Sequence, residues 1–374
     1  MSNILLIIST IIFLSCNSQK PTSKVDKTKI AVENTDNIVY PGIYDTNAYF
    51  GLLKDQDVAV VGNHTSLVEG KHLVDTLLSS GINVVKVFCP EHGFRGDADA
   101  GAKIDDSTDP TTGLPIISLY GKNKKPYDAQ LTGIDIVVFD LQDVGTRFYT
   151  YISTLHYIME ACAENGIPVI VLDRPNPNLH YVDGPVLDTA NNRSFIGMHP
   201  VPVVYGMSIG EYALMINGEK WLKNETNCNL TVINCKNYSR STKYSLPIPP
   251  SPNLPNDRSI ELYPTLCFFE STNLSIGRGT EKQFQIIGHP DFNTMDKATF
   301  TFTPQPNKGA SDPKLNGELC YGFDLSENNS IFDWKCNKLN IGLFIEVYNL
   351  FPDKDNFFKK SNSIELVSGS SAFR

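Results

Sequence analysis

Short runs of valine and isoleucine recur along this chain from residue 57 onward, and they limit the folds that it can adopt. The runs are nearly continuous in apolar residues, as strands that are buried on both faces need to be. Amphipathic segments around 71–80 and 147–166 separate some of them. The alternation predicts an α/β fold with a Rossmann-like, mostly parallel sheet and helices on both faces. The predicted strands are 57–65, 83–93, 116–121, 135–145 and 168–177.

A second pattern begins near residue 290. The apolar segments 298–306, 319–326 and 341–351 differ from the first series in composition and spacing. A chain of 374 residues exceeds an average single domain, so two domains are expected. We predict a Rossmann-like domain over residues 40–288 and a smaller C-terminal α/β domain over residues 289–374.

The N-terminal segment carries signals of export. Residues 4–15 form an apolar run that is shorter than the roughly 20 residues that span a bilayer, and it fits a signal peptide. The run ends in the sequence LSC at Cys16, which resembles a bacterial lipoprotein cleavage site. We predict that residues 1–15 are removed, that Cys16 carries a lipid, and that 16–39 form a polar tether. The protein is then anchored at the bacterial cell envelope, on the periplasmic side; the alternative is an ordinary cleaved signal with an incidental cysteine.

The other cysteines are odd in number and irregularly spaced, which is a poor disulfide framework. Cys89 lies in a predicted strand and Cys162 in a predicted helix, so both are expected to be small buried apolar residues. Cys228 and Cys235, seven residues apart across a probable turn and strand, are the plausible bridge. No CxxC metal-binding spacing occurs.

Charge and motifs exclude several classes of function. A net charge of -9 and a pI near 5.3 argue against a nucleic-acid partner. No GxGxxG follows the first strand and no GxxxxGK[ST] occurs, so no nucleotide cofactor is predicted. His64, His92, Asp140 and Asp173 could converge, but there is no HExxH and no close histidine pair, so no metal is predicted.

Polar side chains gather at the carboxyl ends of the predicted strands, where open parallel sheets bind ligands. Carboxylates, imidazoles and guanidinium groups are all present, which predicts a binding or active site without naming a reaction. The tyrosines and phenylalanines of 147–157 have helical spacing, which favours core positions over a pocket. The strand-end residues are Asn63, His64, Glu91, His92, Asp140, Gln142, Asp143, Arg147, Asp173, Arg174 and Asn176, followed later by Tyr205 and 250–255.

Glu91 is the strongest candidate for a catalytic residue among them. It follows the apolar run 84–89 and Pro90, so its carboxyl is expected to be partly desolvated. Desolvation raises a carboxyl pKa, which a general acid acting near neutral pH requires. The alternative is that Glu91 accepts backbone N–H bonds and caps the following loop.

Five longer stretches resemble one family, the exo-β-N-acetylmuramidases, which were long catalogued as a domain of unknown function. They occur in order, and the resemblance covers the chain from about residue 40 to its end. It implies a cofactor-free glycoside hydrolase that releases β-1,4-linked N-acetylmuramic acid from the non-reducing end of peptidoglycan-derived muropeptides or disaccharides. The stretches are CPEHGFRGDADAG (89–101), FDLQDVGTRFYTYISTL (139–155), LDRPNP (172–177), PPSPNLP (249–255) and FFESTNLSIGRGT (268–280).

The resemblance also implies a catalytic glutamate in the PEHG motif, which is Glu91. Glycosidases ordinarily use two carboxyl groups, and Asp143 and Glu270 are candidates for the second, with Asp140 third. Each could instead be a cap or the charge partner of an arginine. The residues predicted to bind substrate are Asn63, His64, His92, Asp140, Gln142, Arg147, Arg174, Asn176, Tyr205, Asn253, Asn273 and Arg278.

Muramic acid differs from N-acetylglucosamine by its lactyl carboxylate, so a cation is expected in the pocket. Arg278, between Gly277 and Gly279, and Arg147 are the candidates, since guanidinium groups bind carboxylates in a bidentate manner. The alternative is that both arginines pair with nearby acidic residues. The long segments 94–115 and 249–280 are expected to close the cleft, as exo-action requires.

Two departures from the family pattern are visible. Residues 63–66 read NHTS where the family commonly reads NQTG, and the chain ends at SGSSAFR, before an expected C-terminal helical segment. A sugar-binding lipoprotein without catalysis stays open as an alternative function. An esterase or amidase would need a nucleophile, and no GxSxG is present.

Overall fold

The structure is a computed structural model, and it describes residues 38–91, 93–95, 106–327 and 337–373. The predicted signal peptide, Cys16 and most of the tether lie outside the described residues, as does His92. Residues 38–374 form one compact unit. Among the residues described, no helix is long and apolar enough to cross a membrane.

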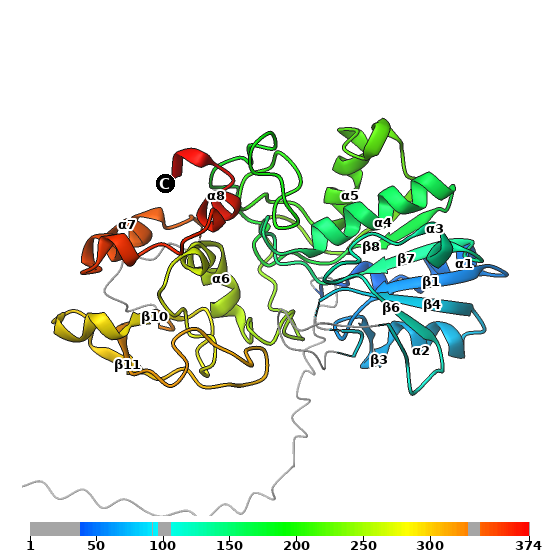
Figure 1. Ribbon diagram of the computed structural model, residues 1–374. Helices are drawn as coiled ribbons and strands as arrows, with labels where there is room; N and C mark the ends of the chain where they lie inside the picture. Colours follow the sequence, from blue (N-terminus) through cyan, green and yellow to red (C-terminus); the bar gives the residue numbers. More distant parts are fainter. Residues whose placement is uncertain (1–37, 92, 96–105, 328–336, 374) are drawn as a thin grey trace, which may run out of the picture. The chain divides into compact units, whose positions relative to one another are not determined.

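A seven-stranded sheet with the order β5-β6-β4-β1-β7-β8-β9 forms the larger part (Figure 1). Every pair in it is parallel except β5 with β6. Without β5 the order follows the Rossmann pattern 3-2-1-4-5-6, with the reversal between β1 and β7. The predicted fold class is confirmed. The strands are β1 (Asp57–Gly62), β4 (Asn83–Cys89), β5 (Ser107–Thr108), β6 (Pro115–Ser118), β7 (Ile136–Asp140), β8 (Val169–Leu172) and β9 (Leu230–Ile233).

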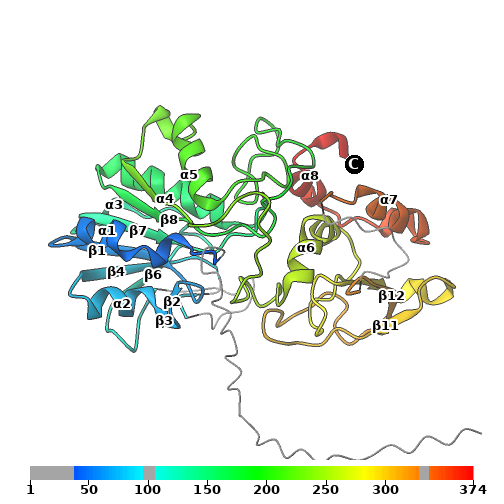
Figure 2. The same ribbon diagram turned by 180° about the vertical axis from the view of Figure 1, so that it is seen from behind.

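Alternate residues of the central strands enter two separate apolar cores, one on each face of the sheet. On one face Val58, Val60 and Val138 pack with α1 (Thr46–Leu53) and α2 (Leu73–Ser79). On the other face Val61, Val137 and Phe139 pack with helices α3, α4 and α5. Figure 2 shows α1 and α2 on the opposite side of the sheet from α4 and α5. Burial on both faces is the physical reason for the continuous valine and isoleucine runs.

The remaining elements near this sheet connect its strands. Helix α4 ends at Gly166, which adopts the left-handed conformation of a C-terminal cap with φ 68°. Helix α5 begins with a capping box in which Ser208 and Glu211 bond reciprocally. These elements are β2 (Leu67–Val68), β3 (Lys71–His72), α3 (Asp128–Leu131), α4 (Tyr151–Asn165) and α5 (Ile209–Gly218).

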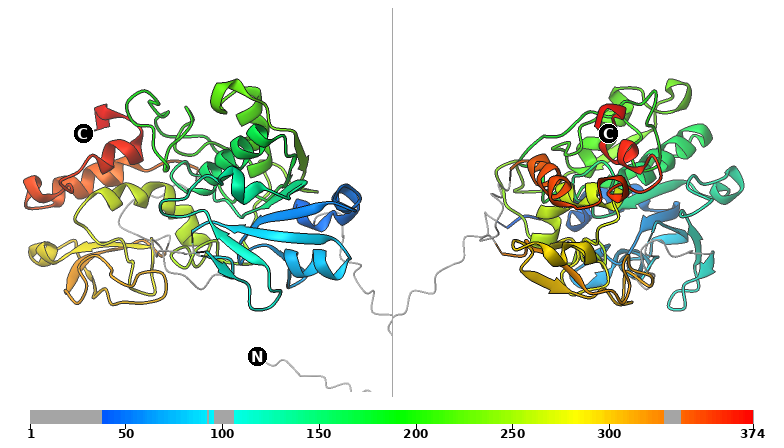
Figure 3. Two further views of the ribbon diagram at one scale, coloured as in Figure 1. Left: turned by 45° about the vertical axis from the view of Figure 1, so that its right-hand side comes forward. Right: turned by 60° about the vertical axis from the view of Figure 1, so that its left-hand side comes forward.

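The C-terminal part contains a three-stranded antiparallel sheet of order β10-β12-β11. Helix α6 lies between this sheet and the helices α7 and α8 (Figure 3). The predicted domain boundary at 288/289 falls inside β10, and the division into two domains stays a prediction. The elements are α6 (Asp257–Leu266), β10 (Ile286–His289), β11 (Phe300–Phe302), β12 (Cys320–Asp324), α7 (Ile341–Leu350) and α8 (Ser363–Ser368).

The plausible Cys228–Cys235 bridge is not formed, and both thiols are free. Strand β9 lies between these cysteines, so they flank an extended segment. Seven residues of extended chain span roughly 20 Å, whereas a disulfide needs Cα atoms within about 7 Å. Cys89 and Cys162 are buried and free, as predicted.

Candidate active site

A cavity of about 70 Å³ lies at the carboxyl ends of β4 and β7, against α6. Glu91 belongs to its wall and follows the last residue of β4 by two positions. A second cavity of about 450 Å³ adjoins the first, because Glu91 and Arg278 line both. The other residues around the first cavity are Phe148, Tyr149, Thr150, Tyr151, Ser251, Asn253, Leu254, Tyr263 and Phe284.

Two tyrosines flank Glu91. The Tyr120 hydroxyl is hydrogen-bonded to the Glu91 carboxylate. Burial is the main cause that raises the pKa of Tyr120, and the charge of Glu91 is the next largest cause. Burial and the Glu91 charge also raise the pKa of Tyr151. Asn63, at the end of β1, donates its amide N–H to the Tyr151 hydroxyl over 2.8 Å. The end of β1 therefore supports the Glu91 site indirectly, through a tyrosine.

An aromatic wall forms one side of the first cavity. The Tyr149 hydroxyl donates to the Pro250 carbonyl at 2.9 Å, which ties this wall to the 249–255 loop. The Tyr149 and Tyr263 rings meet edge to face at 6.1 Å, and Phe284 packs on Tyr263 at 4.9 Å. Sequence spacing favoured core positions for the aromatic residues of 147–157. Phe148, Tyr149 and Tyr151 are buried in the apolar core, as that spacing predicts, and they also line the cavity, because the start of α4 and the preceding turn lie at the strand ends.

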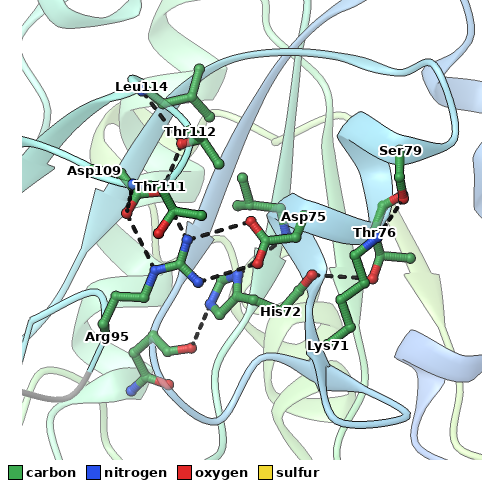
Figure 4. A network of polar contacts seen from close by, with 12 residues as sticks. Lys71, His72, Asp75, Thr76, Ser79, Arg95, Asp109, Thr111, Thr112 and Leu114 are labelled. Atoms are coloured by element: carbon green, nitrogen blue, oxygen red, sulfur yellow. Dashed lines mark hydrogen bonds and ion pairs between the residues drawn. The ribbon is translucent and has the colours of Figure 1, made fainter.

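The turn after Glu91 is held by Arg95 (Figure 4). The Arg95 guanidinium pairs with Asp109 at 2.8 Å and with Asp75 of α2 at 3.3 Å. It also lies over the Phe94 ring, 4.8 Å from its centre, and Phe94 packs edge to face on His72. Burial by itself would raise the pKa of Asp109, but hydrogen bonds from Arg95 and from Thr112 lower it below its ordinary value. The network fixes the turn to α2 and to the start of the β5–β6 hairpin.

Asp143 lies outside the cavity walls, and it is almost completely buried. One carboxylate oxygen accepts hydrogen bonds from the Tyr205 hydroxyl and from the Gly145 N–H. Burial raises the pKa of Asp143 to about 6, although these two hydrogen bonds act in the opposite direction. Its second oxygen has no hydrogen-bond partner among the described residues.

Glu270 and Arg278 form an ion pair in the wall of the second cavity, with 2.7 Å between Oε1 and Nε. Burial would raise the pKa of Glu270, but the charges of Arg278 and Lys314 hold it below its ordinary value. Burial lowers the pKa of Lys314 to about 8, and its ammonium donates to the Thr272 and Leu274 carbonyls. The turn around Arg278 requires Gly277, whose φ is +84° and where a Cβ would clash with the Lys282 carbonyl oxygen.

Asp140 and Arg174 form an ion pair with each other and do not line the cavity. The Arg174 guanidinium forms a bidentate ion pair with the Asp140 carboxylate. Its Nε donates to Oδ1 at 2.6 Å and its Nη2 donates to Oδ2 at 2.7 Å, and both side chains are buried. Such a pair between β7 and the segment after β8 stabilises the strand ends. Neither residue lines the two cavities that contain Glu91.

Arg147, a predicted substrate-binding residue, lines neither of the two cavities that contain Glu91. It is fully buried, and its terminal nitrogens donate to four backbone carbonyls. The acceptors, at 2.7–3.0 Å, are those of Pro185, Val201, Val367 and Ser368. Neither predicted role for Arg147, a substrate cation or a partner for an acidic side chain, matches this arrangement. It joins the 185–201 segment to α8.

The other predicted binding residues divide between the cavity and the framework. Asn253 lines the first cavity and donates to the Gly309 carbonyl at 2.7 Å. His64, which occupies the family's glutamine position, lines a third cavity. The framework residues bond to backbone carbonyls or buried side chains: Gln142 to Pro175, Asn176 to Met207, Asn273 to Asn356, and Tyr205 to Asp143.

Tyr120 contacts Glu91, but it was not among the residues singled out at the strand ends. Tyr120 lies two residues past β6, so the same rule applied to the third predicted strand would have found it. Ser251 lies in the PSPNLP stretch, which had been noted only as polar. Among the described residues, no three His, Cys, Asp or Glu side chains gather so that they could hold a metal ion.

Comparisons with known proteins show which family this chain resembles. The chain matches the family models described as Exo-beta-N-acetylmuramidase NamZ, N-terminal, over residues 58–258 and C-terminal over residues 261–374. It is 36% identical over 351 residues to the peptidoglycan beta-N-acetylmuramidase NamZ of Bacillus subtilis (strain 168), covering 86% of this chain and 82% of that protein.

Two solved structures of DUF1343 family proteins from Bacteroides fragilis NCTC 9343 are similar over the same extent. One has a TM-score of 0.81 at 45% identity, and covers 90% of this chain and 89% of that chain. The other has a TM-score of 0.76 at 30% identity, and covers 90% of each chain.

Proposed function

Since the chain belongs to the exo-β-N-acetylmuramidase NamZ family, we propose that it removes terminal β-1,4-linked N-acetylmuramic acid from peptidoglycan fragments, with Glu91 as general acid. One observation carries this proposal: Glu91 lines both adjoining cavities at the carboxyl end of β4, where the PEHG motif lies. The reaction is a hydrolysis. Glu91 gives a proton to the O4 oxygen of the leaving sugar as the C1–O4 bond breaks. Water supplies the hydroxyl that binds C1, and the remaining proton of that water is released and restores, directly or through solvent, the proton that Glu91 gave.

The second cavity fits the acidic sugar. Arg278, Lys314 and Lys359 line it, and the first of these also reaches the catalytic cavity. Only Nε of Arg278 is needed for the pair with Glu270, so its terminal amino groups offer further donors to a carboxylate. We assign Arg278 to the lactyl carboxylate of muramic acid.

The three carboxyl candidates for a second catalytic group have different surroundings. Asp143 is buried behind the cavity, Asp140 is paired with Arg174, and Glu270 is paired with Arg278. Glu270 is the one of these three that lines a cavity with Glu91. Its pairing favours a role in holding Arg278.

The direct test of the activity compares two chromogenic substrates, an aryl β-N-acetylmuramide and the matching N-acetylglucosaminide. The proposal expects hydrolysis of the muramide and at most slow hydrolysis of the glucosaminide. Binding of the muramide without any release of the aryl group would indicate a sugar-binding protein instead. Equal rates on both substrates would contradict recognition of the lactyl group.

We further propose that the protein is exported to the periplasmic side of the envelope and anchored there through a lipid on Cys16. The apolar run 4–15 and the LSC sequence support this proposal. A Cys16→Ser variant is expected to move from the detergent-soluble membrane fraction to the aqueous fraction. An unchanged membrane fraction in that variant would contradict lipid anchoring at this cysteine.

A further inference from the structure

A third cavity, of about 400 Å³, adjoins the catalytic one, since Ser251 lines both. Its volume is in the range of roughly 300–1,000 Å³ that is common for small-molecule sites. The catalytic cavity therefore has a larger neighbour on each of two sides. It shares Glu91 and Arg278 with the second cavity and Ser251 with the third.

One side of the third cavity is apolar and stiff. Ile248, Pro249, Pro252 and Pro255 line it, and each proline ring fixes its backbone φ. His64 bonds through Nε2 to the Pro249 carbonyl at 2.9 Å, which ties this loop to the end of β1. An apolar wall of this kind suits the C–H face of a pyranose ring.

The opposite side of this loop is also fixed. Asn253 donates to the Gly309 carbonyl at 2.7 Å. Gly309 has φ +96°, and a Cβ there would come within 2.7 Å of Pro252. The chain around residue 309 therefore packs closely on the wall that separates the catalytic and third cavities, and the third cavity is preformed.

Two amide side chains supply the polar part of the third cavity. Gln283 is 7% exposed, and its Oε1 has no hydrogen-bond partner among the described residues. Asn307 donates its amide N–H to the Thr280 carbonyl at 3.2 Å, while its Oδ1 likewise has no partner among them. Both side chains line the third cavity, and both of these oxygens are buried. Buried acceptors that remain unpaired are costly, so hydroxyl or amide donors of a ligand are the complementary groups.

The charges of the two larger cavities differ in arrangement. The second cavity is lined by the cations Arg278, Lys314 and Lys359 and by the acidic residues Glu91, Glu270 and Asp312. With Glu91 protonated, as the proposed general acid, this wall carries one net positive charge. The third holds one cation, Lys308, and one anion, Glu281, so its wall carries no net charge. An acidic sugar is complementary to the former, and a neutral sugar with hydroxyl and acetamido groups is complementary to the latter.

We propose that the third cavity binds the sugar on the leaving-group side of the scissile bond, a neutral N-acetylhexosamine, with Gln283 and Asn307 as its hydrogen-bonding residues. The muramic acid then occupies the second cavity, and the bond between the sugars crosses the catalytic cavity beside Glu91. This assignment rests on the proposed function, and it adds the residues that select the leaving sugar.

The test compares kcat/KM for two substrates in the full chain: the disaccharide N-acetylmuramyl-β-1,4-N-acetylglucosamine and an aryl β-N-acetylmuramide. The aryl group presents no hydroxyls, so it cannot replace the sugar's hydrogen bonds. In Gln283→Leu and Asn307→Leu, the ratio of disaccharide to aryl kcat/KM is expected to fall about tenfold, as loss of one well-formed hydrogen bond predicts.

Gln285→Leu is the matched control, because Gln285 is a buried amide two residues away that lines none of the three cavities. Its substrate ratio is expected to match that of the unchanged protein. A ratio within twofold of the unchanged protein in both cavity variants would overturn the assignment. Absence of hydrolysis of either substrate by the unchanged protein would instead reject the proposed function, so the two failures are distinguishable.

Discussion

Asp143 is a buried carboxyl whose ionisation is expected to influence the stability of the fold. Burial raises its pKa to about 6, from the ordinary 3.8 of an exposed aspartate. The folded protein therefore holds a proton on Asp143 over a pH range in which the unfolded chain has released it. Above pH 6 the charged carboxylate must be accommodated in a buried site, so this residue lowers stability as the pH rises from about 4 to 6.

An Asp143→Asn variant lacks this titration. The free energy of unfolding of the variant, relative to the unchanged protein, is expected to rise by about 2–3 kcal/mol between pH 4 and pH 7. Denaturant unfolding at several pH values measures this difference. If the difference stays constant with pH, Asp143 is already ionised in the folded protein at pH 4.

Arg278 and Arg147 have different expected roles, although both were predicted to bind the lactyl carboxylate. Arg278→Met is expected to reduce the ratio of muramide to glucosaminide hydrolysis about tenfold or more, because it removes a cation from the cavity wall. Arg147→Met should leave that ratio unchanged and lower the free energy of unfolding by about 2–4 kcal/mol, because it leaves buried carbonyls without donors. Kinetics with both substrates and denaturant unfolding separate the two roles. If Arg278→Met keeps the same ratio of muramide to glucosaminide hydrolysis as the unchanged protein, groups other than Arg278 bind the lactyl carboxylate.

At the scale of single elements, the strands with continuous valine and isoleucine could be predicted because burial on both faces leaves little choice of residue. Strands β1, β4, β7 and β8 fall within predicted segments, and β6 overlaps its predicted segment but begins one residue earlier, at Pro115. Strand β5 has only two residues, Ser107 and Thr108, both exposed, so no apolar pattern marks it. Strand β9 has mixed burial, and its pairing with β8 depends on residues 61 positions apart, which local patterns do not record.

The turn after β4 gives a prediction for Arg95. An Arg95→Met variant loses the bonds to Asp75 and Asp109 and is expected to displace the turn that carries Glu91. Because misplacement of a catalytic group by about 1 Å can cost 10²-fold in rate, kcat for the aryl muramide should fall at least about tenfold, with a smaller change in KM. Steady-state kinetics measure this separation of kcat from KM.

Arg240→Met is the control, since Arg240 forms an exposed ion pair with Glu211, in which the side chains are 60% and 41% exposed. Its kcat should remain near that of the unchanged protein. If Arg95→Met behaves like this control, or changes KM alone, Arg95 does not position Glu91. Recovery of kcat in Arg95→Lys would indicate that charge alone holds the turn.

At the scale of the whole molecule, the position of residues at strand ends singled out Glu91 but could not separate it from residues with structural bonds. Glu91 lines a cavity, whereas Asp140 and Arg174 pair with each other and Arg147 bonds to backbone carbonyls. Arg147 illustrates the reason, because two of its acceptors lie 220 and 221 residues away in the sequence. Partners at such separations follow from packing of the complete chain, which neither spacing nor composition encodes.

The arrangement of the three cavities predicts exo-action. The 249–255 and 307–310 segments form walls around Glu91, and muramic acid is expected to fill the space beyond it. Digestion of short glycan fragments should release monosaccharide from the outset, as product analysis over time can show. Early accumulation of intermediate oligosaccharides would mean that a glycan chain passes through the cleft and that the pocket is open at both ends.

The role of Glu91 as proton donor is the centre of this account, and one comparison tests it most directly. The rates of Glu91→Gln are measured on the disaccharide and on an aryl muramide whose leaving group, such as a dinitrophenol, departs without a proton. The account predicts a loss of at least about 10²-fold on the disaccharide and a much smaller loss on the activated substrate, with the fold intact by circular dichroism. Equal losses on both substrates, or near-normal hydrolysis of the disaccharide, would contradict it.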